Sequence, residues 1–183
     1  MSKIDIFNTD KKYNIIYADP AWSYGTTKQV IPSRAKKQAY VPMRMVDIFD
    51  MDISKICADN CVLFLWATFP LLPEALFLIK QWGFEYKTNA FTWVKKNKKE
   101  DSYFWGMGSW TRSNAEICLM ATKGNPKKAS SSVHSIIDSK IEEHSKKPAV
   151  VRDKIVELCG DLPRIELFAR QYADGWDCWG NEV

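Results

Sequence analysis

The sequence lacks the features that mark membrane and secreted proteins. No uncharged apolar run approaches the roughly 20 residues that a membrane-spanning helix needs. The first residues, Met1 to Asp5, do not show the basic, apolar and small-residue order of a signal peptide. From these absences we expect no membrane partner and a cytoplasmic location.

Residues that bind metals or form disulfides are also scarce. The five cysteines are an odd number and include no C-x-x-C pair, so we expect reduced structural thiols rather than a disulfide framework. The only two histidines, His134 and His144, are too few for an ordinary zinc site. We therefore expect no metal cofactor.

Glycine-rich phosphate-binding loops are missing as well. The chain contains neither G-x-G-x-x-G nor a Walker lysine loop, which gives no support to a nicotinamide, flavin or P-loop enzyme. It also has no internal repeat and no low-complexity segment. With 183 residues, of which 46% are hydrophobic, the sequence predicts a single globular domain, residues 1–183, with a substantial core.

The most informative stretch that is present runs from Tyr13 to Trp22. Residues 13–18 are typical of a buried strand, and the strand stops abruptly at Asp19-Pro20. Proline has no N–H and forces the preceding residue into an extended conformation, so Asp19 is expected at the carboxyl end of a strand, where α/β sheets bind ligands. Trp22 adds an aromatic face at the same place. The alternative is that Asp-Pro merely ends the strand in a turn.

Alternating apolar segments predict an α/β fold. We expect strands at 13–18, 61–66, 84–94, 115–122, 133–137 and 164–168, and helices within 43–58, 70–82 and 148–158. Strands that alternate with helices favour a mostly parallel sheet with helices on both faces. Because 84–94 and 115–122 have no helix between them, we expect at least one antiparallel pair.

Several short motifs occur in an order that resembles one family of methyltransferases. Asp19-Pro20-Ala21-Trp22 resembles the Asp-Pro-Pro-Tyr/Trp motif of enzymes that methylate the exocyclic amine of adenine. The motifs that follow it are Trp93 to Asn97, Glu116 to Leu119, Lys123 to Pro126, Ser145 to Pro148, Ile165 to Arg170 and Gly175 to Glu182. Their order resembles the short bacterial and phage members of the MT-A70 family over nearly the whole chain. Ala21 departs from the usual second proline.

This resemblance implies a fold, a cofactor and a reaction. The fold would be a single Rossmann-like methyltransferase domain, and the methyl donor would be S-adenosylmethionine (AdoMet). Asp19, Pro20 and Trp22 would form the catalytic site: the Asp19 carboxylate and the Pro20 carbonyl would accept the two N–H groups of the adenine amine, next to the aromatic ring of Trp22. Accepting these hydrogens localises the nitrogen lone pair, and an anion beside the nitrogen stabilises the positive charge that builds during transfer.

The resemblance also assigns cofactor residues. Lys147 would pair with the carboxylate of the methionine part of AdoMet, and Glu166, Arg170 and Tyr172 would face its ribose. The full set of expected cofactor residues is Asp5, Ile6, Asp19, Lys147, Glu166, Arg170, Tyr172, Asn181 and Glu182. The alternatives are structural: Glu166 could form an ion pair with Arg164 or Arg170, and Trp176 and Trp179 could be core residues.

Basic residues gather in segments that we expect to be loops. The net charge of +4 is modest, but lysines and arginines cluster in several polar stretches, with tryptophans beside some of them. As candidate nucleic-acid contacts we name Tyr24, Arg34, Lys36, Lys95, Lys96, Lys98, Lys99 and Trp105. The alternative is that the lysines form a solvated face or part of a subunit interface.

Three functions stay open at this stage. We expect an adenine-N6 methyltransferase that acts on DNA, because the short chain resembles bacterial and phage members without an added RNA-binding module. An RNA methyltransferase would use the same chemistry. A non-catalytic nucleic-acid-binding partner subunit is the third possibility, although the presence of both Asp19 and Trp22 speaks against it. A homodimer or a partner subunit is compatible with each of these functions.

Overall fold

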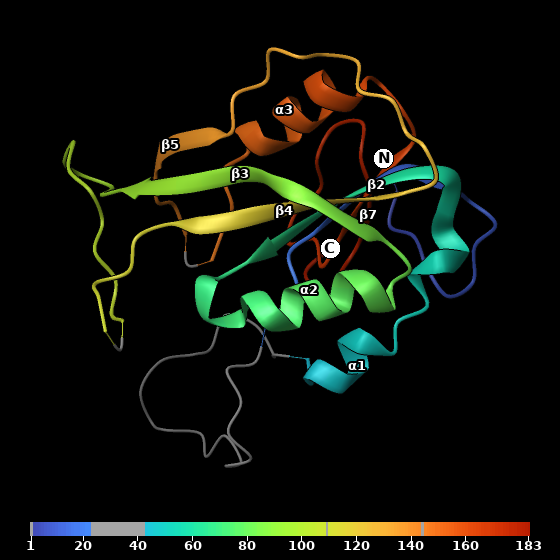
Figure 1. The fold of residues 1–183 in the computed structure, drawn as a ribbon, viewed down its shortest axis with the longest axis horizontal. Coiled ribbons are helices and arrows are strands. Elements are labelled where there is room, and N and C mark those ends of the chain that lie inside the picture. The colour runs from blue at the N-terminus through green and yellow to red at the C-terminus, as the bar shows by residue number, and fades with distance from the viewer. Residues whose placement is uncertain (1, 23–42, 109, 144) are drawn as a thin grey trace.

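The fold is built from one twisted sheet with helices on both sides (Figure 1). The computed structural model describes residues 2–22, 43–108, 110–143 and 145–183. The strands are β1 (Tyr13–Ala18), β2 (Cys57–Ala67), β3 (Glu85–Lys96), β4 (Glu116–Lys123), β5 (Ile136–Lys140), β6 (Arg164–Leu167) and β7 (Asp177–Trp179). The helices are α1 (Met45–Phe49), α2 (Leu72–Gln81) and α3 (Val150–Cys159), with short 3₁₀ turns at Ile53–Ile56 and Phe69–Leu71.

The sheet has the strand order β5-β3-β4-β2-β1-β6-β7. β1 lies between β2 and β6 and runs parallel to both, with Ile16 opposite Leu63 on one side and Ile165 on the other. Among the strands that the structure describes, only β4 is antiparallel to both of its neighbours, β2 and β3. The mostly parallel sheet and the antiparallel pairing of β3 with β4 confirm the fold class predicted from the sequence.

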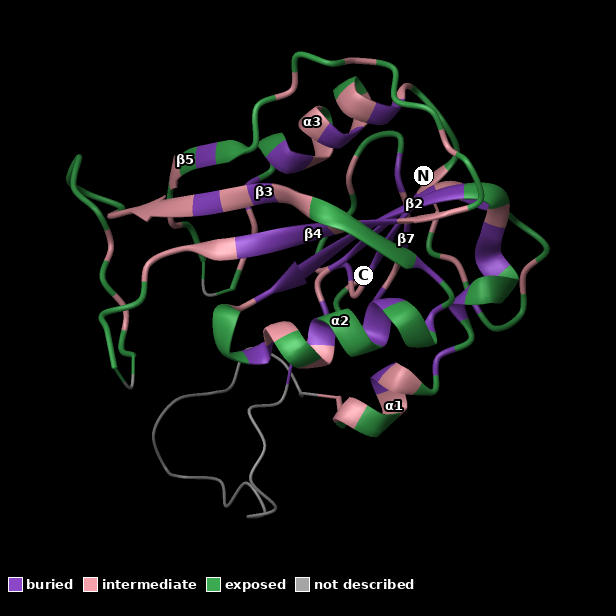
Figure 2. Ribbon diagram, viewed as in Figure 1, coloured by how far each residue is buried: buried purple, intermediate pink, exposed green. Residues whose placement is uncertain are grey.

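Alternation along the central strands creates two separate cores. In β1, Ile16 and Ala18 pack on the side of α1 and α2, whereas Ile15 and Tyr17 pack on the side of α3. β2 divides in the same way, since successive side chains of a strand point to opposite faces. Figure 2 shows the resulting buried centre, with the buried parts of β2 and β4 between α3 on one side and α2 on the other.

Some elements differ from the sequence prediction. β5 begins at Ile136 rather than Val133. By contrast, α1 and the 3₁₀ turn at Ile53–Ile56 both lie within the helical range expected for 43–58. β7 was not predicted, because it has only three residues. Gly175, with φ of +74°, makes the turn that leads into it, a backbone conformation that other residues rarely adopt.

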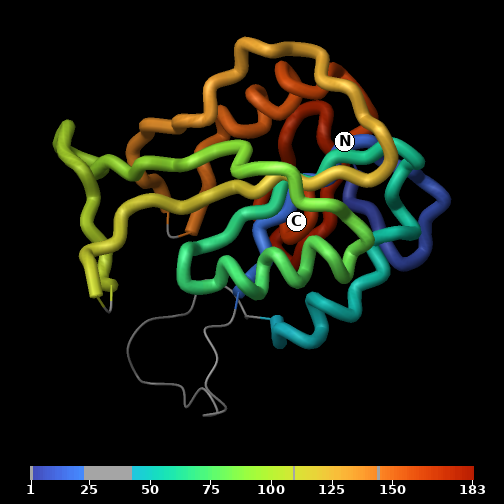
Figure 3. The backbone as a smooth tube through the Cα atoms, in the orientation of Figure 1, coloured from blue at the N-terminus to red at the C-terminus, as the bar shows by residue number. Residues whose placement is uncertain are grey.

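The two ends of the chain meet beside β7 (Figure 3). Lys3 forms a single parallel bridge with Cys178. The carboxylate of Asp177 accepts hydrogen bonds from the Ser2 hydroxyl, at 3.0 Å, and the Tyr13 hydroxyl, at 2.9 Å. Lys11 adds an ion pair to Asp177, at 2.8 Å. These contacts complete the β7 edge of the sheet.

Among the residues that the structure describes, no helix is long and apolar enough to cross a membrane.

Candidate active site

Asp19 stands at the carboxyl end of β1, as the sequence predicted. The strand ends at Ala18, which lies opposite Leu65 of β2 and Leu167 of β6. Pro20 then ends the sheet pairing, and the Trp22 amide donates a hydrogen bond to the Pro20 carbonyl at 2.7 Å. This tight turn holds Asp19, Pro20 and Trp22 at the centre of the edge where parallel strands usually place a ligand.

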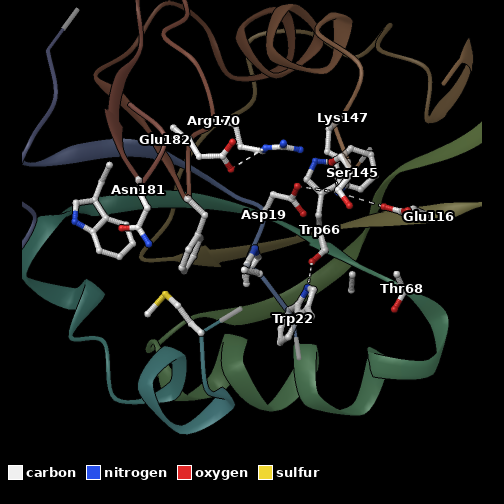
Figure 4. Close-up of a pocket in the computed structure, with 18 residues that line it drawn as sticks. Asp19, Trp22, Trp66, Thr68, Glu116, Ser145, Lys147, Arg170, Asn181 and Glu182 are labelled. Atoms are coloured by element: carbon white, nitrogen blue, oxygen red, sulfur yellow. Dashed lines mark hydrogen bonds and ion pairs between the residues drawn. The ribbon is translucent and has the colours of Figure 1, made fainter. Parts of the chain in front are cut away.

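A pocket of about 370 Å³ opens at this edge (Figure 4). Its walls combine aromatic rings with a few charged side chains, the usual composition of a small-molecule site. The lining residues are Asp19, Pro20, Ala21, Trp22, Met43, Trp66, Ala67, Thr68, Glu116, Ser145, Lys147, Phe168, Ala169, Arg170, Trp179, Gly180, Asn181 and Glu182. A smaller, more polar pocket of about 80 Å³ adjoins it and shares Asp19, Lys147 and Arg170.

A chain of alternating charges crosses the site. Lys147 Nζ donates to Asp19 Oδ2 at 2.8 Å and lies 3.3 Å from Glu116 Oε2. The other oxygen of Glu116 binds Lys95. Each of these four side chains is less than a quarter exposed, so solvent screens their interactions much less than it would at the surface. Lys147 also lies 5.5 Å from the centre of the Trp66 ring.

Burial and neighbouring charges pull the protonation equilibria of these groups in different directions. Burial raises the pKa of Asp19, and the Lys147 ammonium only partly opposes that effect. Burial would raise the pKa of Glu116 too, but Lys147 and Lys95 together bring it below its ordinary value. For Lys147, burial acts to lower the pKa, and the two carboxylates outweigh burial and raise it. The charged form of Lys147 is therefore favoured, and among these three groups only the charged form of Asp19 is disfavoured.

Trp22 is fixed by a relay of hydrogen bonds beneath the pocket. Its indole N–H donates to the Trp66 carbonyl at 2.9 Å, and only 8% of the residue is exposed. The Trp66 indole in turn donates to the Tyr17 hydroxyl at 2.7 Å. The ring of Trp22 is thus a rigid part of the pocket wall.

The carboxyl-terminal segment supplies the opposite wall. Arg170 Nε binds Glu182 Oε1 at 2.9 Å, and both residues, with Asn181, line the main pocket. Trp179 packs edge-to-face on Phe168, with ring centres 5.4 Å apart. Phe168 follows β6 with φ of +62°, an uncommon conformation for an aromatic residue. The strained turn at Phe168 lets the chain pass from β6 directly into the pocket wall.

The sequence is similar to proteins of a known family. The family model described as MT-A70 matches residues 13–182. The chain belongs to the MT-A70 family. It is therefore a member of a methyltransferase family, and its fold is consistent with a Rossmann-like methyltransferase domain.

Individual MT-A70 relatives differ in how much of their length the chain covers. It is 34% identical to the type II methyltransferase M.MunI of Mycoplasma sp, over 94% of the chain and 78% of that protein. It is 26% identical to the N(6)-adenine-specific methyltransferase METTL4 of Homo sapiens and 24% identical to the N6-methyladenosine RNA methyltransferase MTA1 of Pyricularia oryzae. The chain spans 39% and 50% of the length of those two proteins.

The predicted cofactor residues fall into three groups. The first group lines the main pocket and comes from distant parts of the sequence: Asp19, Lys147, Arg170, Asn181 and Glu182. Glu166 lines the adjoining pocket, where Arg152 of α3 binds it through two hydrogen bonds, at 2.6 and 2.8 Å.

The remaining three predicted cofactor residues do not line the main pocket. Asp5 is exposed, Ile6 is buried in the core, and Tyr172 is 55% exposed.

The predicted nucleic-acid residues are likewise divided. Lys95 binds Glu116, which lines the main pocket, and Lys96 binds Asp101 at 2.9 Å and Asp138 at 3.1 Å. Lys98, Lys99 and Trp105 are exposed on the connection between β3 and β4. Tyr24, Arg34 and Lys36 lie outside the described residues.

Sequence reasoning missed two polar members of the site. Glu116 lay in one of the MT-A70 motifs, but nothing local showed that its partners would be Lys95 and Lys147. Arg152 looked like an ordinary surface residue of a helix. The signals for Glu116 were its place in that motif and a charge next to the apolar run Ile117 to Ala121.

Proposed function

We propose that this chain is an AdoMet-dependent methyltransferase that modifies the exocyclic N6 amine of adenine in DNA. The observation that carries the proposal is the position of Asp19: a partly desolvated carboxylate at the end of the central strand, next to the fixed ring of Trp22 and bonded to Lys147. A carboxylate, a backbone carbonyl and an aromatic face are suitable groups to hold an extruded nucleobase by its amine.

The pocket residues fit AdoMet. Its methionine end carries a carboxylate and an ammonium group, and the pocket offers an adjacent cation and anion, Lys147 and Asp19. Lys147 has three N–H donors: two face Asp19 and Glu116, and the third makes only a long contact, 3.4 Å, with the Ser145 carbonyl. A ligand carboxylate could replace that long contact.

The other end of the cofactor also finds suitable groups. Phe168 and Trp179 provide flat apolar surfaces for the adenine ring, and Arg170, Asn181 and Glu182 provide donors and acceptors for hydroxyl groups and ring nitrogens. The volume of about 370 Å³ lies within the range of roughly 300–1,000 Å³ found for small-molecule sites.

The residues of the chain would act on the amine by orientation and charge. AdoMet, when bound, supplies an electrophilic methyl group on a sulfonium. Asp19 and the Pro20 carbonyl accept the two N–H groups of the amine, which localises its lone pair. Trp22 N–H holds the Pro20 carbonyl in place, and Lys147 holds Asp19 through Oδ2. As the methyl group leaves the sulfur, which becomes a neutral thioether, positive charge would develop on the amine nitrogen, and the fixed carboxylate would stabilise it. The methylated nitrogen would then release one of its two protons to solvent.

The preference for DNA rests on the resemblance to short bacterial and phage members, and on similarity over 94% of the chain to a type II methyltransferase of Mycoplasma sp. RNA is the second candidate substrate, because fungal relatives are described as N6-methyladenosine RNA methyltransferases. A non-catalytic role is less well supported, since the described pocket contains a carboxylate, aromatic walls and a cation.

The test is a transfer assay with tritium-labelled AdoMet. Matched DNA and RNA oligonucleotides would be compared with versions in which purine, lacking the amine, replaces every adenine. We expect label only in the adenine-containing DNA, and N6-methyldeoxyadenosine after digestion to nucleosides. Label in RNA alone would show that RNA, not DNA, is the substrate. No label in any nucleic acid, with AdoMet bound normally, would contradict it.

A further inference from the structure

The connection between β3 and β4 is an ordered hairpin at the edge of the sheet that carries the pocket. We call residues 97–114 the aromatic hairpin; position 109 is outside the described residues. Backbone hydrogen bonds from Asn97 to Ser102, at 2.9 Å, and from Gly106 to Ser113, at 2.7 Å, hold its two sides. At its base, the Asn114 side chain bonds both the N–H and the C=O of Lys95, at 3.0 and 2.9 Å.

Large side chains of this hairpin face solvent. Tyr103 is 52% exposed, Trp105 56%, Met107 89% and Trp110 98%. The rings of Tyr103 and Trp105 meet edge-to-face, with centres 6.3 Å apart. Two tryptophans exposed to this extent on one short segment contribute little to the core, and clustered exposed apolar surface usually marks an interaction site.

Positive charge accompanies the rings. Lys98, Lys99 and Arg112 are exposed, and among the residues that the structure describes neither Lys98 nor Lys99 has an ion-pair partner. The hairpin also contains Glu100 and Asp101, but Asp101 is bound by Lys96. Flat rings beside unpaired lysines are complementary to a strand of unstacked bases and phosphates.

The base of the hairpin is part of the active site. β4 runs against its neighbours, so its first residue, Glu116, lies at the same edge as Asp19 and lines the pocket. On the other side of the hairpin, Lys95 binds Glu116. A polynucleotide with one base in the pocket would have its neighbouring nucleotides close to this segment.

We propose that the aromatic hairpin grips the strand beside the target base, with bases stacked on Trp105 and Trp110 and phosphates bound by Lys98 and Lys99. The inference rests on the proposed nucleic-acid substrate and deepens it: the ligand of the hairpin is single-stranded or locally opened nucleic acid. Removing a base from its stack costs a few kcal/mol, and stacking of its neighbours on protein rings offsets that cost.

The first experiment measures binding without catalysis. A fluorescein-labelled, mixed-sequence single-stranded DNA 20-mer would be titrated with wild type, the double variant Trp105→Ala/Trp110→Ala, and Tyr86→Ala. Tyr86 is a matched control, because it is an exposed aromatic residue at the other end of β3. We expect the double variant to lose at least tenfold in affinity, since each base–aromatic stack contributes about 1–3 kcal/mol, and we expect Tyr86→Ala to bind as wild type does.

The second experiment tests the lysines. For Lys98→Ser/Lys99→Ser, the slope of log affinity against log salt concentration should become shallower by about 0.7 per lost phosphate contact on single strands. AdoMet affinity, measured by calorimetry, should be unchanged in all three hairpin and control variants, because the pocket is formed by other residues.

Two results would overturn the proposal. One is wild-type affinity for the 20-mer in the double tryptophan variant. The other is a wild type that sediments as a dimer and a double variant that sediments as a monomer with unchanged DNA affinity per chain, which would make the hairpin a subunit interface. Both can be told apart from failure of the proposed function, because absence of methyl transfer from every nucleic acid would leave these binding measurements intact.

Discussion

Burial disfavours the charged form of Asp19, and the ammonium of Lys147 opposes that effect. Burial raises the pKa of Asp19, Lys147 at 2.8 Å acts in the opposite direction, and the nearby Glu116 carboxylate adds to the rise. A carboxylate in this position is poorly hydrated, so it interacts strongly with any positive charge that develops beside it. The same desolvation makes the residue unfavourable for the stability of the free protein.

Asp19→Asn should therefore lower the rate of methyl transfer without lowering the stability of the protein. We expect methyl transfer to fall by about 10² to 10³-fold, the usual effect of removing one transition-state-stabilising group. The folded-state pKa of Asp19 lies above the unfolded one, so at neutral pH the ionised carboxylate lowers the free energy of unfolding, and the uncharged amide does not. Lys147 keeps Glu116 as a partner.

Thermal unfolding at several pH values would check the stability part of this prediction. The melting temperature of Asp19→Asn should equal or exceed that of wild type at pH 7.5, by about 2–4 °C for each kcal/mol gained. The difference should shrink towards pH 4, where the carboxyl of the wild type is increasingly protonated. The exposed Asp10 provides the control substitution, Asp10→Asn, which should be neutral at both pH values. A clear loss of stability in Asp19→Asn at pH 7.5 would contradict the prediction.

The pH dependence of turnover should report the same residue. In the proposed mechanism Asp19 acts as a carboxylate, so kcat should fall on the acid side, at a pH above the ordinary range for aspartate, because burial raises the pKa of Asp19. Lys147→Met removes the cation that opposes the rise in pKa, so the acid limb should move to higher pH. Lys146→Met is the control for loss of a neighbouring positive charge, because Lys146 pairs with Glu142 and, although it lines the smaller pocket, it does not line the main one. Identical acid limbs in wild type and Lys147→Met would exclude Asp19 as the titrating group.

At the scale of elements, α3 is joined to β6 by one buried ion pair. Arg152 binds both oxygens of Glu166, with side chains 13% and 9% exposed, and lies 5.9 Å from the centre of the Tyr17 ring. Burial raises the pKa of Glu166, and the Arg152 guanidinium opposes the rise. The pair therefore fixes the helix against the strand that leads to Phe168 and Arg170.

Arg152→Met should destabilise the protein by roughly 3–5 kcal/mol, because it leaves a buried carboxylate without its partner. Arg152→Met/Glu166→Gln should recover much of that loss, since no unpaired charge then remains. Urea unfolding of the two variants would measure both effects. A single variant with wild-type stability would show that solvent reaches Glu166 more freely than the structure indicates.

The sequence predicted the position of a candidate site residue correctly where that residue directly follows a buried strand. The apolar run before Asp19-Pro20 placed Asp19 correctly, because a proline after a buried strand leaves few alternatives for the preceding residue. Lys95 shows the limit. It belongs to a lysine run typical of an exposed loop, but β3 extends to Lys96 and directs Lys95 towards Glu116. Such partners are set by the register of β3 and β4, which the hydrophobic pattern does not encode residue by residue.

At the scale of the whole molecule, AdoMet should act as a stabilising ligand. At a concentration one hundred times its dissociation constant, a ligand that binds only the folded state adds about 2.7 kcal/mol, which corresponds to an increase in melting temperature of roughly 5–10 °C for a protein of this size. Lys147→Met should lose most of this increase at the same AdoMet concentration, and Lys146→Met should retain it. An equal increase in both variants would remove Lys147 from the proposed cofactor contacts.

The position of β1 between β2 and β6 also has a consequence for the order of folding. β2, α2, β3 and β4 follow one another along the chain and pair among themselves, so they can assemble while later residues are still being synthesised. In contrast, Ile16 can pair with Ile165, and Asp19 can form its ion pair with Lys147, only after those later residues have been synthesised. The pocket should therefore be the last part of the protein to form. A nascent chain without β6 would contain Asp19 but should not bind AdoMet. On refolding, AdoMet binding should therefore appear with the slowest phase.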